Sequence, residues 1–249
     1  MVQTIPAQET TLHDLRIKFN LQYTDDNQFF REWQDNLSEV SESEKQSLER
    51  IKTNYLNLIE YPPMLENAES RPVFTDGETP LLGELFKRAV KMVVLSPLLD
   101  LAGFYQRPFR ISTEKQVEIV SEDDGTIVKG KIDVLVLQEQ LWILVIEAKK
   151  AQFSLEPGIP QALAYILANP NLEKPKCNSS FFISYFSSLA PHPSPLFSLV
   201  TNGSNFIFIK LMKQEIPLYA LSDEFTLRRA NDLSIVLKVL KRLGKLVVV

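Results

Sequence analysis

The stretch that most constrains the fold is GKIDVLVLQEQLWILVIEAKK, from Gly130 to Lys150. It contains two apolar runs, KIDVLVL and LWILVIEA, with only QEQ between them, which is the length of a tight hairpin turn. Both runs are apolar at consecutive positions, so both faces of these strands need cover from other elements. Together with the preceding EKQVEIV run, they predict a three-stranded antiparallel meander.

Helical patterns surround this meander. Ser41 and Glu44 form a capping-box pattern before a helix ending at Pro62, in which Leu48, Leu56 and Ile59 follow the apolar stripe. PLLGELFKRAVKMVVLSPLLDLAGF predicts a largely buried helix that is broken or kinked near Pro97. PGIPQALAYILANP predicts a second helix, and the segment from about Leu227 to Leu243 a third. LFSLVTNGSNFIFIKL predicts two strands around an Asn-Gly turn.

These elements predict an α/β fold with the core order helix, three-strand antiparallel meander, helix, strand. We expect a helical N-terminal arm over residues 1–70 and the core domain over residues 71–249, with the boundary in the polar stretch before Thr79. The segment 177–195 is either an extra strand or an inserted loop, and the sequence leaves both open.

Composition narrows the functional class. The net charge of −4 argues against a surface that binds nucleic acid over its whole extent. The single cysteine, Cys177, excludes a disulfide framework and a cysteine-based zinc site. No apolar run reaches the roughly 18 to 20 residues that a membrane-spanning helix requires, and no secretory signal pattern opens the chain. We therefore expect a cytoplasmic protein with no membrane partner.

Charged residues gather where the apolar strands end. A QEQ turn that pairs Leu137 with Leu141 would set Asp133 opposite Val145. Because side chains alternate along a strand, Asp133, Glu147 and Lys149 would then project from one side of the sheet. Lys150 would face the other side.

Burying these charges without a counterion would cost several kcal/mol. A divalent cation would relieve the repulsion between the two carboxylates. Carboxylate oxygens, a backbone carbonyl and water suit Mg²⁺. A bound cation of this kind activates water and neutralises a phosphate, while Lys149 orients the water or stabilises developing charge. The pattern indicates phosphodiester hydrolysis.

The next predicted helix adds a polar pair, Gln161 and Tyr165. At 100° per residue they lie one turn apart on one face, opposite Leu163, Ile166 and Leu167. We expect this pair to face the charged edge of the sheet, with Gln161 in reach of the lysine or a phosphate.

Asp133, the Glu147-Ala148-Lys149 run and the Gln-x-x-x-Tyr helix together resemble the PD-(D/E)xK, or restriction-endonuclease-like, nuclease superfamily. More narrowly, that helix and the LVTNGSNF hairpin are similar to the nuclease domain of type I restriction enzyme R subunits. The resemblance spans roughly residues 79–211. It departs from the pattern at Ile132, where the motif has proline, and the chain shows no Walker-type ATP-binding loop.

The resemblance implies a Mg²⁺-dependent endonuclease that cleaves DNA, with Mn²⁺ as a substitute. It implies Asp133, Glu147, the Ala148 carbonyl and Glu84 as metal ligands, and Lys149 as catalytic, with Gln161 and Tyr165 in support. Glu84 has a plain alternative, since Lys87 and Arg88 lie at helical spacing to pair with it.

Two other functions stay open. The chain could be a catalytically silent nucleic-acid-binding or assembly subunit of a restriction-like complex, which the acidic composition and the missing motor favour. It could also cleave RNA, because the site chemistry is the same. Partners would be DNA and either a second copy of the chain, since cutting a duplex requires two sites, or restriction-like subunits.

Overall fold

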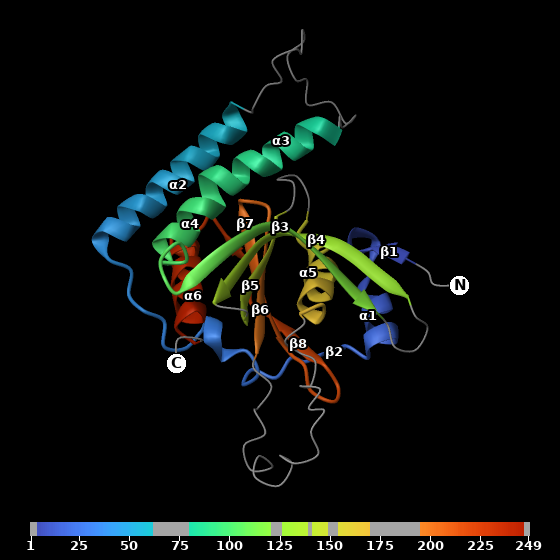
Figure 1. Cartoon of the computed structure of the whole chain (residues 1–249). Helices are drawn as coiled ribbons and strands as arrows, with labels where there is room; N and C mark the ends of the chain where they lie inside the picture. The colour runs from blue at the N-terminus through green and yellow to red at the C-terminus, as the bar shows by residue number, and fades with distance from the viewer. Residues whose placement is uncertain are drawn as a thin grey trace.

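A computed structural model describes residues 4–61, 80–120, 126–138, 141–148, 154–169 and 195–246. It is a mixed α/β fold in which helices cover a large sheet (Figure 1). The segment 177–194, part of the stretch whose structure the sequence leaves open, lies outside the described residues. None of the helices in the described ranges is long and apolar enough to cross a membrane.

One nine-stranded sheet runs through the molecule. Its main path has the order β1-β4-β5-β6-β7-β8-β2, while β3 pairs with β4 and β9 pairs with β7. β3, β4 and β5 pair antiparallel in succession, as the sequence predicts, and β6 and β7 form the predicted hairpin. The strands are β1 (Thr4–Pro6), β2 (Gln22–Tyr23), β3 (Phe109–Val120), β4 (Ile127–Gln138), β5 (Leu141–Ala148), β6 (Leu196–Thr201), β7 (Asn205–Met212), β8 (Leu218–Leu221) and β9 (Phe225–Thr226).

Helices pack on both faces of this sheet, so the central strands are buried on both sides, as their unbroken apolar runs predict (Figure 1). One core joins the sheet to α2, η3, α4 and α6, and the other joins it to α1 and α5. The helices are η1 (Ala7–Glu9), α1 (Leu12–Phe19), η2 (Arg31–Trp33), α2 (Glu42–Glu60), α3 (Pro80–Val90), η3 (Lys91–Leu95), α4 (Ser96–Leu101), α5 (Gly158–Leu167) and α6 (Asp232–Lys245).

The N-terminal segment contributes strands as well as helices. β1 pairs parallel with β4, and β2 pairs parallel with β8. α2 begins at the predicted capping box, in which the Ser41 hydroxyl accepts from the Glu44 N–H and the Glu44 carboxylate accepts from the Ser41 N–H. Leu56 and Ile59, expected in its apolar stripe, are 46% and 40% exposed, because the buried face of α2 runs through Leu48, Ile51 and Tyr55.

One sequence prediction of local structure is wrong. Asp133 does not lie opposite Val145, because Val145 pairs with Leu135 and the register shifts between Val136 and Leu137. The long helix, expected to break or kink near Pro97, departs from α-helical geometry just before this residue. It passes through a π-helical turn, η3, and Pro97 lies in the first turn of α4, where its missing N–H costs little.

An ion pair between Glu44 of α2 and Lys241 of α6 joins the N-terminal segment to the last helix. The Lys241 hydrogen bond is the largest cause that lowers the pKa of Glu44. Since the folded-state pKa lies below the unfolded value, this carboxylate adds stability above the unfolded pKa and loses it as the pH falls through the folded pKa.

We expect Glu44→Gln, which keeps the capping geometry, to lower the free energy of unfolding by roughly 1 kcal/mol at neutral pH. Urea unfolding from pH 7 down to acid pH should show the deficit shrinking as Glu44 protonates in the native protein. Glu42→Gln is the control, because Glu42 forms an exposed pair with Lys45 on the same helix. A deficit that is independent of pH would contradict the ion-pair account.

Candidate functional site

The site forms where β4 changes its neighbour. Residues 127–129 of β4 pair with β1, and residues 134–138 pair with β5. Both partners lie on the edge of β4 opposite β3. Among the described residues, no strand pairs with the intervening residues 130–133 on this edge. Their backbone groups need other partners.

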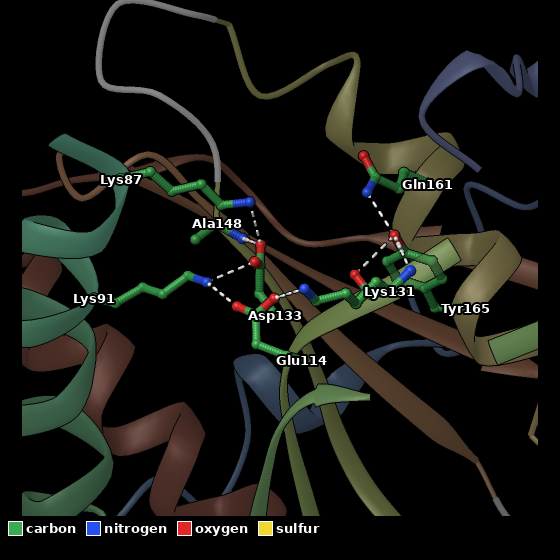
Figure 2. Close-up of polar contacts among 8 residues, drawn as sticks. All are labelled: Lys87, Lys91, Glu114, Lys131, Asp133, Ala148, Gln161 and Tyr165. Atoms are coloured by element: carbon green, nitrogen blue, oxygen red, sulfur yellow. Dashed lines mark hydrogen bonds and ion pairs between the residues drawn. The ribbon is translucent and has the colours of Figure 1, made fainter. Parts of the chain in front are cut away.

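Tyr165 of α5 supplies these partners. Its hydroxyl donates to the Lys131 carbonyl at 3.1 Å and accepts from the Lys131 N–H at 3.2 Å. The Gln161 side-chain amide donates to the same hydroxyl at 2.6 Å (Figure 2). Gln161 and Tyr165 are both 1% exposed. The predicted polar pair therefore does face the sheet, and it holds the backbone of β4 two residues before Asp133.

Gly130 allows the Tyr165 ring to lie against β4. A Cβ at this position would clash with Tyr165 Cε1 and would lie 2.7 Å from the Ala7 Cβ of η1. Real Cβ atoms do not approach other heavy atoms so closely, so only glycine fits beneath the ring.

Asp133 is a buried carboxylate with three donors. The residue is 4% exposed. Its Oδ1 lies 2.6 Å from Lys91 Nζ, and its Oδ2 lies 2.9 Å from Lys87 Nζ and accepts from the Ala148 N–H at 2.9 Å (Figure 2). The donors come from α3, η3 and β5. The ion pairs and the N–H together compensate the loss of hydration that burial imposes on the charge.

Glu114 of β3 lies beside this group. The neighbouring pairs Thr113↔Val134 and Lys115↔Ile132 put it at the position opposite Asp133, and its φ of 57° is in the left-handed region. Its carboxylate binds Lys131 at 2.7 Å and Lys91 at 3.0 Å. The Lys131 and Lys91 hydrogen bonds lower the pKa of Glu114 to about 2.

Lys91 therefore joins Asp133 to Glu114. Burial acts to lower the pKa of Lys91, but the hydrogen bond and charge of Asp133, and then Glu114, outweigh it and raise that pKa. The ammonium stays charged at neutral pH.

Glu147 is 2% exposed and occupies the next position on β5 after Ile146, whose partner is Val134. It thus stands with Asp133 at the end of the β4–β5 pairing. Burial is the largest cause that raises the pKa of Tyr165 to about 12, followed by the charge of Glu147, with a smaller effect from Asp133. Both carboxylates thus act on the Tyr165 hydroxyl, while Ala148 binds Asp133 through its N–H.

Two predicted site residues fall outside this description. Lys149 lies outside the described residues. Glu84 belongs to α3 by its backbone, one turn before Lys87, but its side chain is not among those described. Lys87, the alternative partner proposed for Glu84, binds Asp133.

The sequence analysis missed Lys87, Lys91 and Glu114. Lys87 and Lys91 stand at i, i+4 spacing, so one face of a helix carries both. That spacing is visible in the sequence, but it does not show which distant carboxylate the two lysines reach. Glu114 carries no sequence signal, because a left-handed glutamate within a strand is unusual.

The described part of the chain contains no group of three or more His, Cys, Asp or Glu side chains arranged to hold a metal ion. It does supply two buried carboxylates at one strand end, which are hard oxygen donors of the kind that Mg²⁺ prefers. Among the described residues, Asp133 Oδ1 accepts from one donor, Lys91, and carboxylate oxygens have room for two interactions.

A family model described as the type I restriction enzyme R protein N terminus matches residues 7–215. The match covers most of the chain, and the chain belongs to this family. It includes β2 to β7 and every residue of the site described above. A comparison with curated proteins gives no match.

We expect Tyr165→Phe to lower the free energy of unfolding by about 1–3 kcal/mol, because the buried Gln161 amide and the part-buried Lys131 backbone groups lose this hydroxyl partner. Urea unfolding measures the change. Tyr61→Phe is the control, since Tyr61 is 73% exposed at the end of α2. Equal stability of Tyr165→Phe and wild type would show that the hydroxyl does not hold β4.

Gly130→Ala should destabilise the protein by about 1–3 kcal/mol, because the added methyl group meets the Tyr165 ring and Ala7. Thermal unfolding followed by circular dichroism checks this. An unchanged melting temperature would mean that the ring can move away from β4 without loss.

Proposed function

We propose that the chain is a Mg²⁺-dependent phosphodiesterase that cleaves DNA, an endonuclease of the PD-(D/E)xK type. Membership of the restriction-enzyme family suggests a nuclease related to restriction. The observation that carries the proposal further is the placement of two buried carboxylates, Asp133 and Glu147, at the end of the β4–β5 pairing. Glu147 is two residues before Lys149 in the sequence.

Asp133 and Glu147 would hold the metal ion through their carboxylates, with the Ala148 carbonyl and Glu84 as further candidates. The donor set is entirely oxygen, which fits Mg²⁺ and also Mn²⁺. The ammonium groups on Asp133 would have to yield at least one position to the ion.

A bound divalent ion supplies an activated water and neutralises charge on the phosphate. The oxygen of that water bonds to phosphorus while one P–O ester bond breaks, which leaves a phosphomonoester and a hydroxyl. Lys149 would orient the water or stabilise the negative charge that grows on the phosphoryl oxygens. Gln161 and Tyr165 would act by holding β4 and hence Asp133 in position.

The second candidate function is a catalytically silent nucleic-acid-binding or assembly subunit. The observation that favours it is the charge compensation of Asp133, which two ammonium groups and an N–H already achieve. These partners balance the charge of Asp133 without a metal ion.

Several expectations belong with this proposal. They are the division into residues 1–70 and 71–249, a restriction-endonuclease-like core, cytoplasmic location, and a partnership with DNA and with a second copy or restriction-like subunits. RNA remains an alternative substrate, and cleavage of RNA and DNA of matched sequence distinguishes the two.

The test is cleavage of supercoiled plasmid and single-stranded DNA with Mg²⁺ or Mn²⁺. We expect wild type to nick DNA, and Asp133→Asn and Lys149→Ala to lose roughly 100-fold or more of the rate. All proteins are prepared identically, and thermal unfolding confirms that each variant is folded.

Equal nicking by wild type and by folded Asp133→Asn would contradict the proposal, since a contaminating nuclease would then explain the activity. Absence of cleavage by wild type with every metal, together with DNA binding, would favour the silent subunit.

A further inference from the structure

Two lysines on one helix face converge on the buried Asp133 from the side opposite α5. Lys87 lies in the last turn of α3, and Lys91 is the first residue of the π-helical turn η3. Their side chains are 16% and 19% exposed. Each ammonium binds a different oxygen of Asp133 (Figure 2). π-helical turns inside helices recur at functional sites, where they redirect side chains.

The two ammonium groups occupy the directions from which a cation would approach Asp133. Together they carry the charge of one divalent ion, and like an ion they require the carboxylate to be negative. A carboxylate cannot give its full interaction to two ammonium groups and to a metal ion at once, because the cations repel each other.

Lys91 has a second carboxylate within reach. Its ammonium already lies 3.0 Å from Glu114, which is 49% exposed and is held by Lys131 on its other oxygen. Lys91 can therefore leave Asp133 without losing a counterion. Glu114 reaches this position through its left-handed backbone.

We propose that Lys87 and Lys91 are an internal counterion for Asp133 that a divalent cation displaces, so that these lysines set the metal affinity of the site. The inference rests on the proposed role of Asp133 as a metal ligand. In the absence of metal the lysines keep the buried carboxylate compensated. When an ion binds, Lys91 turns to Glu114 and Lys87 is released toward solvent.

The test is Mn²⁺ binding by isothermal titration calorimetry on the whole chain, with no nucleic acid present. We expect Lys91→Gln and Lys87→Gln each to bind Mn²⁺ about tenfold more tightly than wild type, because one competing charge is removed. Each variant keeps the other ammonium on Asp133. The metal-free melting temperature should fall in both variants, and saturating Mn²⁺ should restore it.

Two controls separate displacement from a general change of charge. Lys131→Gln removes a nearby charge that binds Glu114, and Lys241→Gln removes an ammonium that is also 19% exposed and pairs with Glu44 on α2. We expect both to change Mn²⁺ affinity by no more than about twofold. Lys91→Gln that binds Mn²⁺ no more tightly than Lys131→Gln would overturn the inference.

Failure of the inference and failure of the proposed function give different results. Cleavage by wild type, with unchanged Mn²⁺ affinity in Lys87→Gln and Lys91→Gln, would overturn displacement and leave the nuclease. Tighter Mn²⁺ binding by the variants, with no cleavage by any protein, would support displacement and reject turnover. Absence of Mn²⁺ binding by wild type and by both variants would overturn displacement.

Discussion

The negative charge of Asp133, buried inside the fold, is the constraint on which the rest of the site depends. An isolated carboxylate at 4% exposure would cost several kcal/mol, so its partners must be built into the fold. They come from one continuous helix, formed by α3 and its π-helical turn η3, and from the strand β5. The helix on one side and the neighbouring strand are thus fixed to the same point of β4. A change in any of them alters the surroundings of the charge.

A second constraint acts on the opposite side of β4. The backbone groups between the segment that pairs with β1 and the segment that pairs with β5 need hydrogen-bond partners. Tyr165 meets this need by bonding both the N–H and the carbonyl of Lys131, and Gly130 makes room for the ring. The Gln161–Tyr165 pair is therefore explained by the interruption in strand pairing. Asp133 lies where the interruption meets the end of β5, and its carboxylate accepts from the Ala148 N–H there. The same hydroxyl lies in the field of Glu147, so the backbone support and the carboxylates are electrostatically coupled.

The sequence predicts what local patterns decide. Apolar runs predict β4 and β5, the capping box predicts the start of α2, and helical spacing puts Gln161 and Tyr165 on one face. It fails where distant contacts decide. The strand register depends on an irregularity between Val136 and Leu137 that no turn signal marks. Lys87 has an adequate local partner at Glu84 in the sequence, yet tertiary structure brings it to Asp133. The prediction that Asp133, Glu147 and Lys149 act together stays a prediction, because Lys149 lies outside the described residues.

The charges of the described site explain how a chain with a net charge of −4 could engage a polyanion. Among the described residues, Lys87, Lys91 and Lys131 pair with Asp133 and Glu114, and Glu147 is buried nearby. Three ammonium groups thus stand against three carboxylates. A neutral cluster in an acidic protein attracts a negatively charged phosphodiester only weakly. A divalent ion bound to Asp133 would give the cluster a net positive charge. It would also release an ammonium group that binds Asp133 when no ion is present. Metal and phosphate would then bind cooperatively, since each compensates the charge that the other introduces. Under this proposal, nucleic acid would bind tightly only to a site that already holds the metal ion.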